Sequence, residues 1–101
     1  GELEEARLLY HCALHANEVT LGADHPETLS SMNSLAALLS AHGKFGEAEP
    51  FYRLVLQHRR AALGEDHIDT LRSANNLAGL LQAQGSLDEA ESLFRTAAQG
   101  R

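Results

Sequence analysis

The chain has 101 residues, of which 44% are hydrophobic and only 5% aromatic, which suits one compact domain and favours helices. Its net charge of −6 argues against non-specific binding to nucleic acid and against docking on an anionic membrane. No apolar run approaches the ~20 residues of a membrane span. The single cysteine, Cys12, cannot form an internal disulfide, so we expect a reducing compartment, the cytoplasm.

The sequence repeats itself with a period of 42 residues. The first copy, 1–42, and the second, 43–84, agree at 18 of 42 positions without a gap, and a third begins at Gly85. A period of this size is typical of a stacked array of helical or strand units. Such arrays usually present a continuous surface to a partner. Because the chain begins and ends inside a copy, we expect it to be a segment of a longer protein.

Five helices are predicted, at residues 2–20, 26–42, 45–62, 68–84 and 87–98. Apolar residues at spacings of three and four mark the second and fourth as amphipathic, namely Leu29, Met32, Leu35, Ala36 and Leu39, and Leu71, Ala74, Leu77, Ala78 and Leu81. The other three helices share a different stripe: Leu3, Ala6, Tyr10, Ala13 and Leu14; Phe45, Ala48, Phe51 or Tyr52, Val55 and Leu56; Leu87, Ala90, Phe94 and Ala97. We expect these recurring residues to form the core, because every copy must pack in the same way.

The connections between the predicted helices contain glycine and potential caps. Gly22, Gly43, Gly64 and Gly85 follow helices, where a left-handed conformation is expected. Asp24 and Asp66 fit an N-cap with a carboxylate three residues on, and His25 and His67 read as loop and capping residues. Pro50 is expected in about the first turn of its helix, where its missing N–H costs little. The short connections imply antiparallel helix pairs.

Two recurring patterns carry a family resemblance. The first helix of each pair holds Leu35-Ala36 or Leu77-Ala78 followed by a Leu, and the second holds a small–aromatic–small series. These patterns resemble the tetratricopeptide repeat. The 42-residue period and its Leu-Gly-x-Asp-His-x-x-Thr-Leu connection are similar to the kinesin light chain type.

The resemblance implies an all-α fold, an α-solenoid of antiparallel helix pairs that forms a TPR-like right-handed superhelix of five helices. Residues 1–101 would form a single array. In this array, 1–21 is the second helix of a truncated repeat, and 22–62 and 63–101 are full helix pairs.

The resemblance also implies a peptide-binding groove lined by the first helix of each pair. On this sequence the groove positions are Ser30, Asn33, Ser34, Ala37, Ser40 and Ala41, and Arg72, Asn75, Asn76, Gly79, Gln82 and Ala83. Small residues would let a peptide backbone approach, and amides can pair with its N–H and C=O groups. The alternative is that Asn33 or Asn75 ties adjacent helices together. We expect Arg72, with Asn75 or Asn76, to hold a linear motif that mixes acidic and apolar residues.

We therefore predict a non-catalytic protein–protein interaction module, a scaffold or adaptor that binds a peptide segment of a protein partner. The alternative is a structural spacer, or a segment that self-associates through uncapped ends. Those ends are the opening helix and the apolar residues Leu87, Leu93 and Phe94 of the last helix.

No catalytic, metal or cofactor site is predicted. His11 and His15 have a spacing that can share a metal, but no further ligand clearly completes a set, so a solvated helix face is favoured. Cys12 lacks a recognisable relay. Residues 43–46 lack the spacing of a phosphate-binding loop.

Positive charge gathers near the end of the third predicted helix. Arg53, His58, Arg59 and Arg60 lie there, and we expect them to complement the negative end of the helix macrodipole. The alternative is an outer-face patch for an acidic partner.

Overall fold

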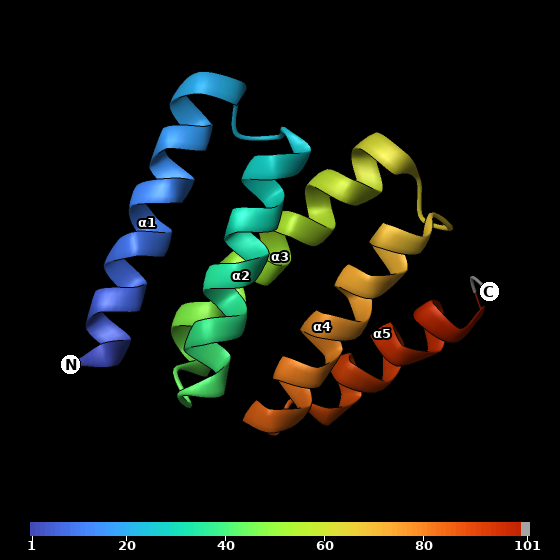
Figure 1. The fold of residues 1–101 in the computed structure, drawn as a ribbon. Helices are drawn as coiled ribbons and strands as arrows, with labels where there is room; N and C mark the ends of the chain where they lie inside the picture. Colours follow the sequence, from blue (N-terminus) through green and yellow to red (C-terminus); the bar gives the residue numbers. More distant parts are fainter. Residues whose placement is uncertain (100–101) are drawn as a thin grey trace. The chain divides into compact units, whose positions relative to one another are not determined.

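In a computed structural model, the structure describes residues 1–99, with side chains to residue 98. The described residues form five helices and no strand: α1 (Glu2–Leu21), α2 (Pro26–Ala41), α3 (Phe45–Leu63), α4 (Ile68–Gln84) and α5 (Leu87–Gln99) (Figure 1). Each predicted helix is found, and its ends differ from the prediction by at most one residue. The all-α repeat fold is therefore confirmed. None of these helices is both long and apolar enough to cross a membrane.

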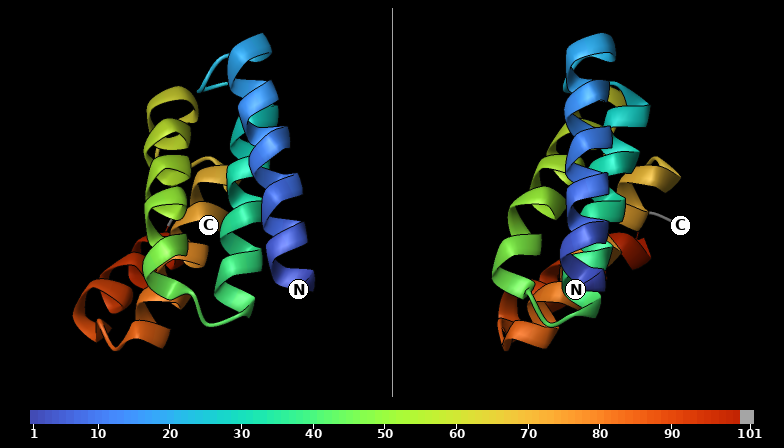
Figure 2. Two further views of the ribbon diagram at one scale, coloured as in Figure 1. Left: turned by 90° about the vertical axis from the view of Figure 1, so that its left-hand side faces the viewer. Right: turned by 60° about the vertical axis from the view of Figure 1, so that its left-hand side comes forward.

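The chain divides into two compact units, residues 1–51 and 52–101, and the boundary falls inside α3. In the first unit, α1 lies antiparallel beside α2, as the views of Figures 1 and 2 agree. In the second unit, α4 packs against α5. The division of the chain into repeats at residues 22 and 63 stays a prediction.

The apolar stripes of α2 and α4 form most of the core. Every residue predicted for them is at most 6% exposed: Leu29, Met32, Leu35, Ala36 and Leu39 on α2, and Leu71, Ala74, Leu77, Ala78 and Leu81 on α4. Full burial of one such leucine is worth about 1.5–3 kcal/mol relative to an exposed side chain. These two helices are therefore held mainly by their leucine and alanine faces.

The second stripe is mostly buried in α3, where Phe45 stays half-buried, but only partly buried in the two outer helices. In α3, Tyr52 is 8% exposed and Val55 fully buried, and burial raises the pKa of Tyr52. In α1, Tyr10 is 38% exposed and Ala13 is exposed, and in α5 Phe94 is 37% exposed. The prediction that these three residues are buried is wrong for the described chain, and it is also wrong for Leu87 of α5, which is 61% exposed.

Histidines, not aspartates, cap α2 and α4. His25 and His67 adopt the same N-cap conformation, φ −66° and ψ 142°. In each cap Nδ1 accepts a 3.1 Å hydrogen bond from the backbone N–H two residues on. The prediction that Asp24 and Asp66 are the caps is wrong. An N-cap must stand directly before the first helical residue, and the aspartates lie one position too early.

The glycine prediction is confirmed for Gly85, which is left-handed, but not for Gly22, whose φ of 101° and ψ of 156° lie outside that conformation. The proline prediction is wrong. The four connecting glycines, Gly22, Gly43, Gly64 and Gly85, have φ between +78° and +101°. Pro50 lies inside α3, where it is the sixth residue and so falls beyond the first turn. At this depth it removes a hydrogen bond to the carbonyl of Gly46, which a first-turn proline would not do.

Candidate peptide-binding site

A cavity of about 410 Å³ opens on α4. Ile68, Leu71, Arg72 and Asn75 line it. These residues are three, four and seven positions apart, so they occupy one face of the helix. Leu71 is 6% exposed and forms a buried apolar base, whereas Ile68 is 62% exposed. The cavity thus combines an aliphatic surface with one cation and one amide.

Arg72 has no hydrogen bond or ion pair with any residue that the structure describes. The other described arginines all have partners, namely Arg7 with Glu47, Arg53 with Glu89, Arg59 with Ser73, Arg60 with Glu65 and Arg95 with Glu91. An exposed guanidinium presents up to five donors in a planar fork that matches a carboxylate. Arg72 is therefore available to an external anion without loss of a described contact.

The amides predicted for the groove differ in availability. Asn33 and Asn76 already have an interaction partner within the chain. Asn75 is half-buried, lines the cavity beside Arg72 and makes no hydrogen bond to a described residue. Two roles were considered for Asn75, peptide binding and a tie between adjacent helices. The described contacts do not support the tie.

The remaining groove positions of α4 do not line this cavity. Asn76 and Gly79 are exposed, and a Cβ added to Gly79 would meet nothing within 4 Å. Gln82 lines a separate hollow of about 180 Å³, together with residues of α5 that include Leu87 and Phe94. The peptide-binding role of these residues stays a prediction.

The predicted groove positions of α2 belong to the first unit. Ser30 and Ala37 are exposed there, and Asn33, Ser34 and Ser40 are half-buried. Their role in peptide binding also stays a prediction.

A polar tie that the sequence prediction missed joins helices within each unit. In the first unit, Asn17 Nδ2 of α1 donates to Ser31 Oγ of α2 at 2.8 Å. In the second, Arg59 of α3 donates to Ser73 Oγ of α4 at 2.7 Å, and Ser73 in turn donates to the Asp69 carbonyl. Asn17 and Arg59 share a place in the 42-residue period, as do the two serines. The serine recurs in both copies, and from this recurrence the tie could have been predicted. The sequence hides it because the donor differs, an asparagine in the first copy and an arginine in the second.

Ion pairs join alternate helices. Arg7 of α1 pairs with Glu47 of α3 at 3.2 Å, and Arg53 of α3 pairs with Glu89 of α5 at 2.9 Å. The two glutamates share a place in the period. The side-chain hydrogen bonds from Arg53 hold the pKa of Glu89 below its ordinary value.

Besides the two N-cap histidines, His11 and His42 make described contacts. No three His, Cys, Asp or Glu residues of the described segment are arranged to hold a metal ion. The His11 ring packs edge-on against Phe51 at a centroid distance of 6.2 Å. His42 Nδ1 lies 3.0 Å from the Leu38 carbonyl at the end of α2.

Helix pairs whose packing residues recur at the same spacing in both copies define a helical repeat protein. The chain belongs to the tetratricopeptide repeat family, whose model matches residues 1–61 and again 43–101. Its repeats are of the kinesin light chain type. Tetratricopeptide repeats generally mediate protein–protein interaction and are typically non-catalytic.

Solved structures give the same fold. The chain is similar to BtubC (BKLC) from P. vanneervenii, with a TM-score of 0.90 and 24% identity over 100% of this chain and 40% of that one. It is also similar to the nearly identical TPR-like repeats of a putative kinesin light chain from Podosopora anserina, with a TM-score of 0.87 and 30% identity over 96% of this chain and 46% of that one. The chain thus spans less than half the length of these structures. No curated protein matches the sequence.

Proposed function

We propose that this chain is a non-catalytic scaffold or adaptor module of the cytoplasm that binds a short peptide segment of a partner protein through the cavity on α4. The peptide combines a carboxylate with an aliphatic side chain. The carboxylate pairs with Arg72, the amide of Asn75 bonds to the peptide backbone, and the aliphatic group lies on Ile68 and Leu71.

The single observation that carries this proposal is the state of Arg72. It is the one described arginine without a partner, and it lies in a cavity whose other polar residue, Asn75, is also unbonded to any described group. A stabilising role would have given Arg72 a carboxylate or carbonyl to contact, as it has for Arg59. Exposed Cys12 agrees with a reducing compartment, where a thiol stays unpaired.

A second candidate role is that of a self-associating spacer in a longer array. The exposed apolar side chains of α1 favour it, since Leu8 is 64% exposed and Leu9 and Val19 are each 72% exposed. Surfaces of this kind in repeat proteins associate with a neighbour.

Fluorescence polarisation with labelled nine-residue peptides that mix Asp or Glu with Leu tests the peptide-binding proposal. Arg72→Ala is expected to raise Kd about tenfold, the effect of removing a charge-assisted hydrogen bond of ~1.4 kcal/mol. Higher salt should weaken the wild type more than the variant, because the lost contact is electrostatic.

The matched control is Arg95→Ala, which removes the same charge from an exposed residue of α5. It should leave Kd unchanged within twofold. Equal affinities of wild type and Arg72→Ala would exclude the proposed role of Arg72. Absence of binding by any peptide of the set would favour the spacer.

A further inference from the structure

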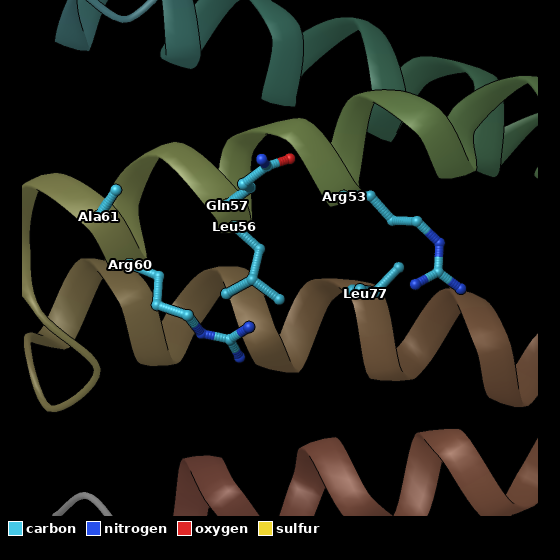
Figure 3. A pocket seen from close by; sticks show the side chains of 6 residues that line it. All are labelled: Arg53, Leu56, Gln57, Arg60, Ala61 and Leu77. Atoms are coloured by element: carbon cyan, nitrogen blue, oxygen red, sulfur yellow. The ribbon is translucent and has the colours of Figure 1, made fainter.

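A second cavity, of about 470 Å³, lies elsewhere in the second unit. Arg53, Leu56, Gln57, Arg60 and Ala61 of α3 line it with Leu77 of α4. Figure 3 shows Arg53, Leu56 and Arg60 extending from α3 towards α4. Leu56 and Leu77 are buried, at 5% and 2% exposure, so the base of the cavity is apolar and its rim carries two guanidinium groups.

The rim is positive although the chain as a whole is negative. Residues 50–64 hold three arginines and no carboxylate. Arg59 points into its tie with Ser73, which leaves Arg53 and Arg60 as the cations of the cavity. Their Cα atoms are seven residues apart on one helix, about 10 Å along its axis.

This positive rim is confined to one copy of the repeat. The apolar base recurs, since Leu14 and Leu35 stand at the period positions of Leu56 and Leu77. The rim does not recur. At the period positions of Arg53, Gln57 and Arg60 the first copy has His11, His15 and Glu18. Packing explains the residues that repeat. Arg60 and its counterpart Glu18 are both exposed, and the change from glutamate to arginine reverses the charge at this position.

Two carboxylates that contact these arginines are exposed. Arg60 pairs with Glu65 at 3.0 Å, with side-chain exposures of 40% and 68%. Arg53 pairs with Glu89, with exposures of 42% and 49%. Solvent-exposed ion pairs of this kind contribute little to stability, so another carboxylate can replace or join them.

We propose that this cavity is a second docking site, which binds an acidic peptide whose two carboxylates pair with Arg53 and Arg60 and whose central aliphatic side chain faces Leu56 and Leu77. It is separate from the cavity of Arg72, and its function does not depend on that one. In an extended peptide, side chains at positions one, three and five point to the same side. The fitting pattern is therefore acidic, aliphatic, acidic at alternate positions.

The probe that tests this proposal is the labelled peptide acetyl-Glu-Ser-Leu-Ser-Glu-amide, with the Gln-Ser-Leu-Ser-Gln peptide as its uncharged match. Binding is followed by fluorescence polarisation and by the arginine Nε–H signals in nitrogen-15 NMR spectra of the whole chain. The acidic peptide is expected to bind at least fivefold more tightly than its match. It should shift the signals of Arg53 and Arg60.

Matched variants separate this site from others. Arg60→Gln should raise Kd at least fivefold, whereas Arg95→Gln, which also loses an exposed ion pair, and Arg72→Gln should each change it less than twofold. Glu89→Gln should lower Kd, because it removes a carboxylate that competes for Arg53. If the Arg53–Glu89 pair has a purely structural role, Glu89→Gln should give no gain in peptide affinity.

The proposal is overturned if Arg60→Gln and Arg95→Gln bind the peptide equally well, or if the Gln peptide binds as tightly as the Glu peptide. Loss of binding in Arg72→Gln alone would overturn it as well. That result would place the peptide in the α4 cavity and support the proposed function instead.

Discussion

At the scale of single residues, equal positions in the two copies of the repeat have different polar environments. Thr28 and Thr70 share a place in the period and are both buried, at 0% and 2% exposure. The hydroxyl of Thr28 donates to the Gly22 carbonyl at 2.7 Å, but that of Thr70 has no partner among the described residues. The same residue therefore carries a hydrogen bond in one copy and a desolvation cost in the other.

The two threonines give opposite predictions for one substitution. Thr28→Val should destabilise the fold by about 1 kcal/mol, since the Gly22 carbonyl loses its donor. Thr70→Val should be neutral or stabilising, because a methyl group replaces an unpaired buried hydroxyl of similar size. Urea denaturation of both variants measures the difference. Equal losses of stability would show that the hydroxyl of Thr70 is bonded in solution.

The histidine caps allow a second test at this scale. His67→Ala should cost about 1 kcal/mol because the N–H of Asp69 loses its acceptor, whereas His67→Ser restores an acceptor and should lie within a few tenths of the wild type. The same two substitutions at His25 repeat the test at the N-cap of α2. Thermal unfolding followed by circular dichroism gives the comparison. If Ser and Ala destabilise equally, the imidazole contributes by packing and not as a cap.

At the scale of helices, α4 has a glycine inside its exposed face. Gly79 lies in the middle of α4, and the space around its Cα is open. A glycine in a helix interior costs about 1 kcal/mol relative to alanine. Stability alone therefore favours alanine here, which is the residue that the first copy has at this place, Ala37.

Gly79→Ala should raise stability by roughly 0.5–1 kcal/mol and, if a peptide backbone passes along α4, weaken peptide binding severalfold. Gly46→Ala on α3 is the control, because its added Cβ also meets nothing within 4 Å. Denaturation and the polarisation assay are run on the same samples. A stabilised Gly79→Ala variant with unchanged affinity would argue that no peptide approaches this part of the helix.

At the scale of the whole molecule, exposed apolar residues are concentrated on the first helix. Leu8 and Val19 are eleven positions apart, three helical turns, so they lie on the same face of α1. We expect concentration-dependent association through this face, which the double substitution Leu8→Glu and Val19→Glu should abolish. Sedimentation velocity over a hundredfold concentration range, with reductant to keep Cys12 reduced, measures it. A monomer at every concentration would contradict this prediction.

Much of the fold could be predicted because its determinants are local. The spacing of Leu35, Ala36 and Leu39, repeated 42 residues later, defines an amphipathic helix in any environment that offers an apolar partner. Burial in the two outer helices could not be predicted in the same way. Tyr10 and Tyr52 share a place in the period, yet one is 38% and the other 8% exposed. Their exposure depends on which helices are adjacent, and the residue pattern within one helix does not specify its neighbours.

The candidate site, like the fold, could be predicted from the sequence only in part. The sequence by itself determined the helices, their buried stripes and the polar faces that remain, since these follow from periodicity and the need of each copy to stack. Only the tertiary structure decided which polar side chains were already engaged. It joined Arg59 to Ser73 and Arg53 to Glu89, left Arg72 beside Asn75 without a described partner, and gathered Arg53 and Arg60 over a single cavity. The reason is physical: hydrogen bonds and ion pairs depend on distances of about 3 Å between side chains far apart in sequence, and the period alone does not define such distances.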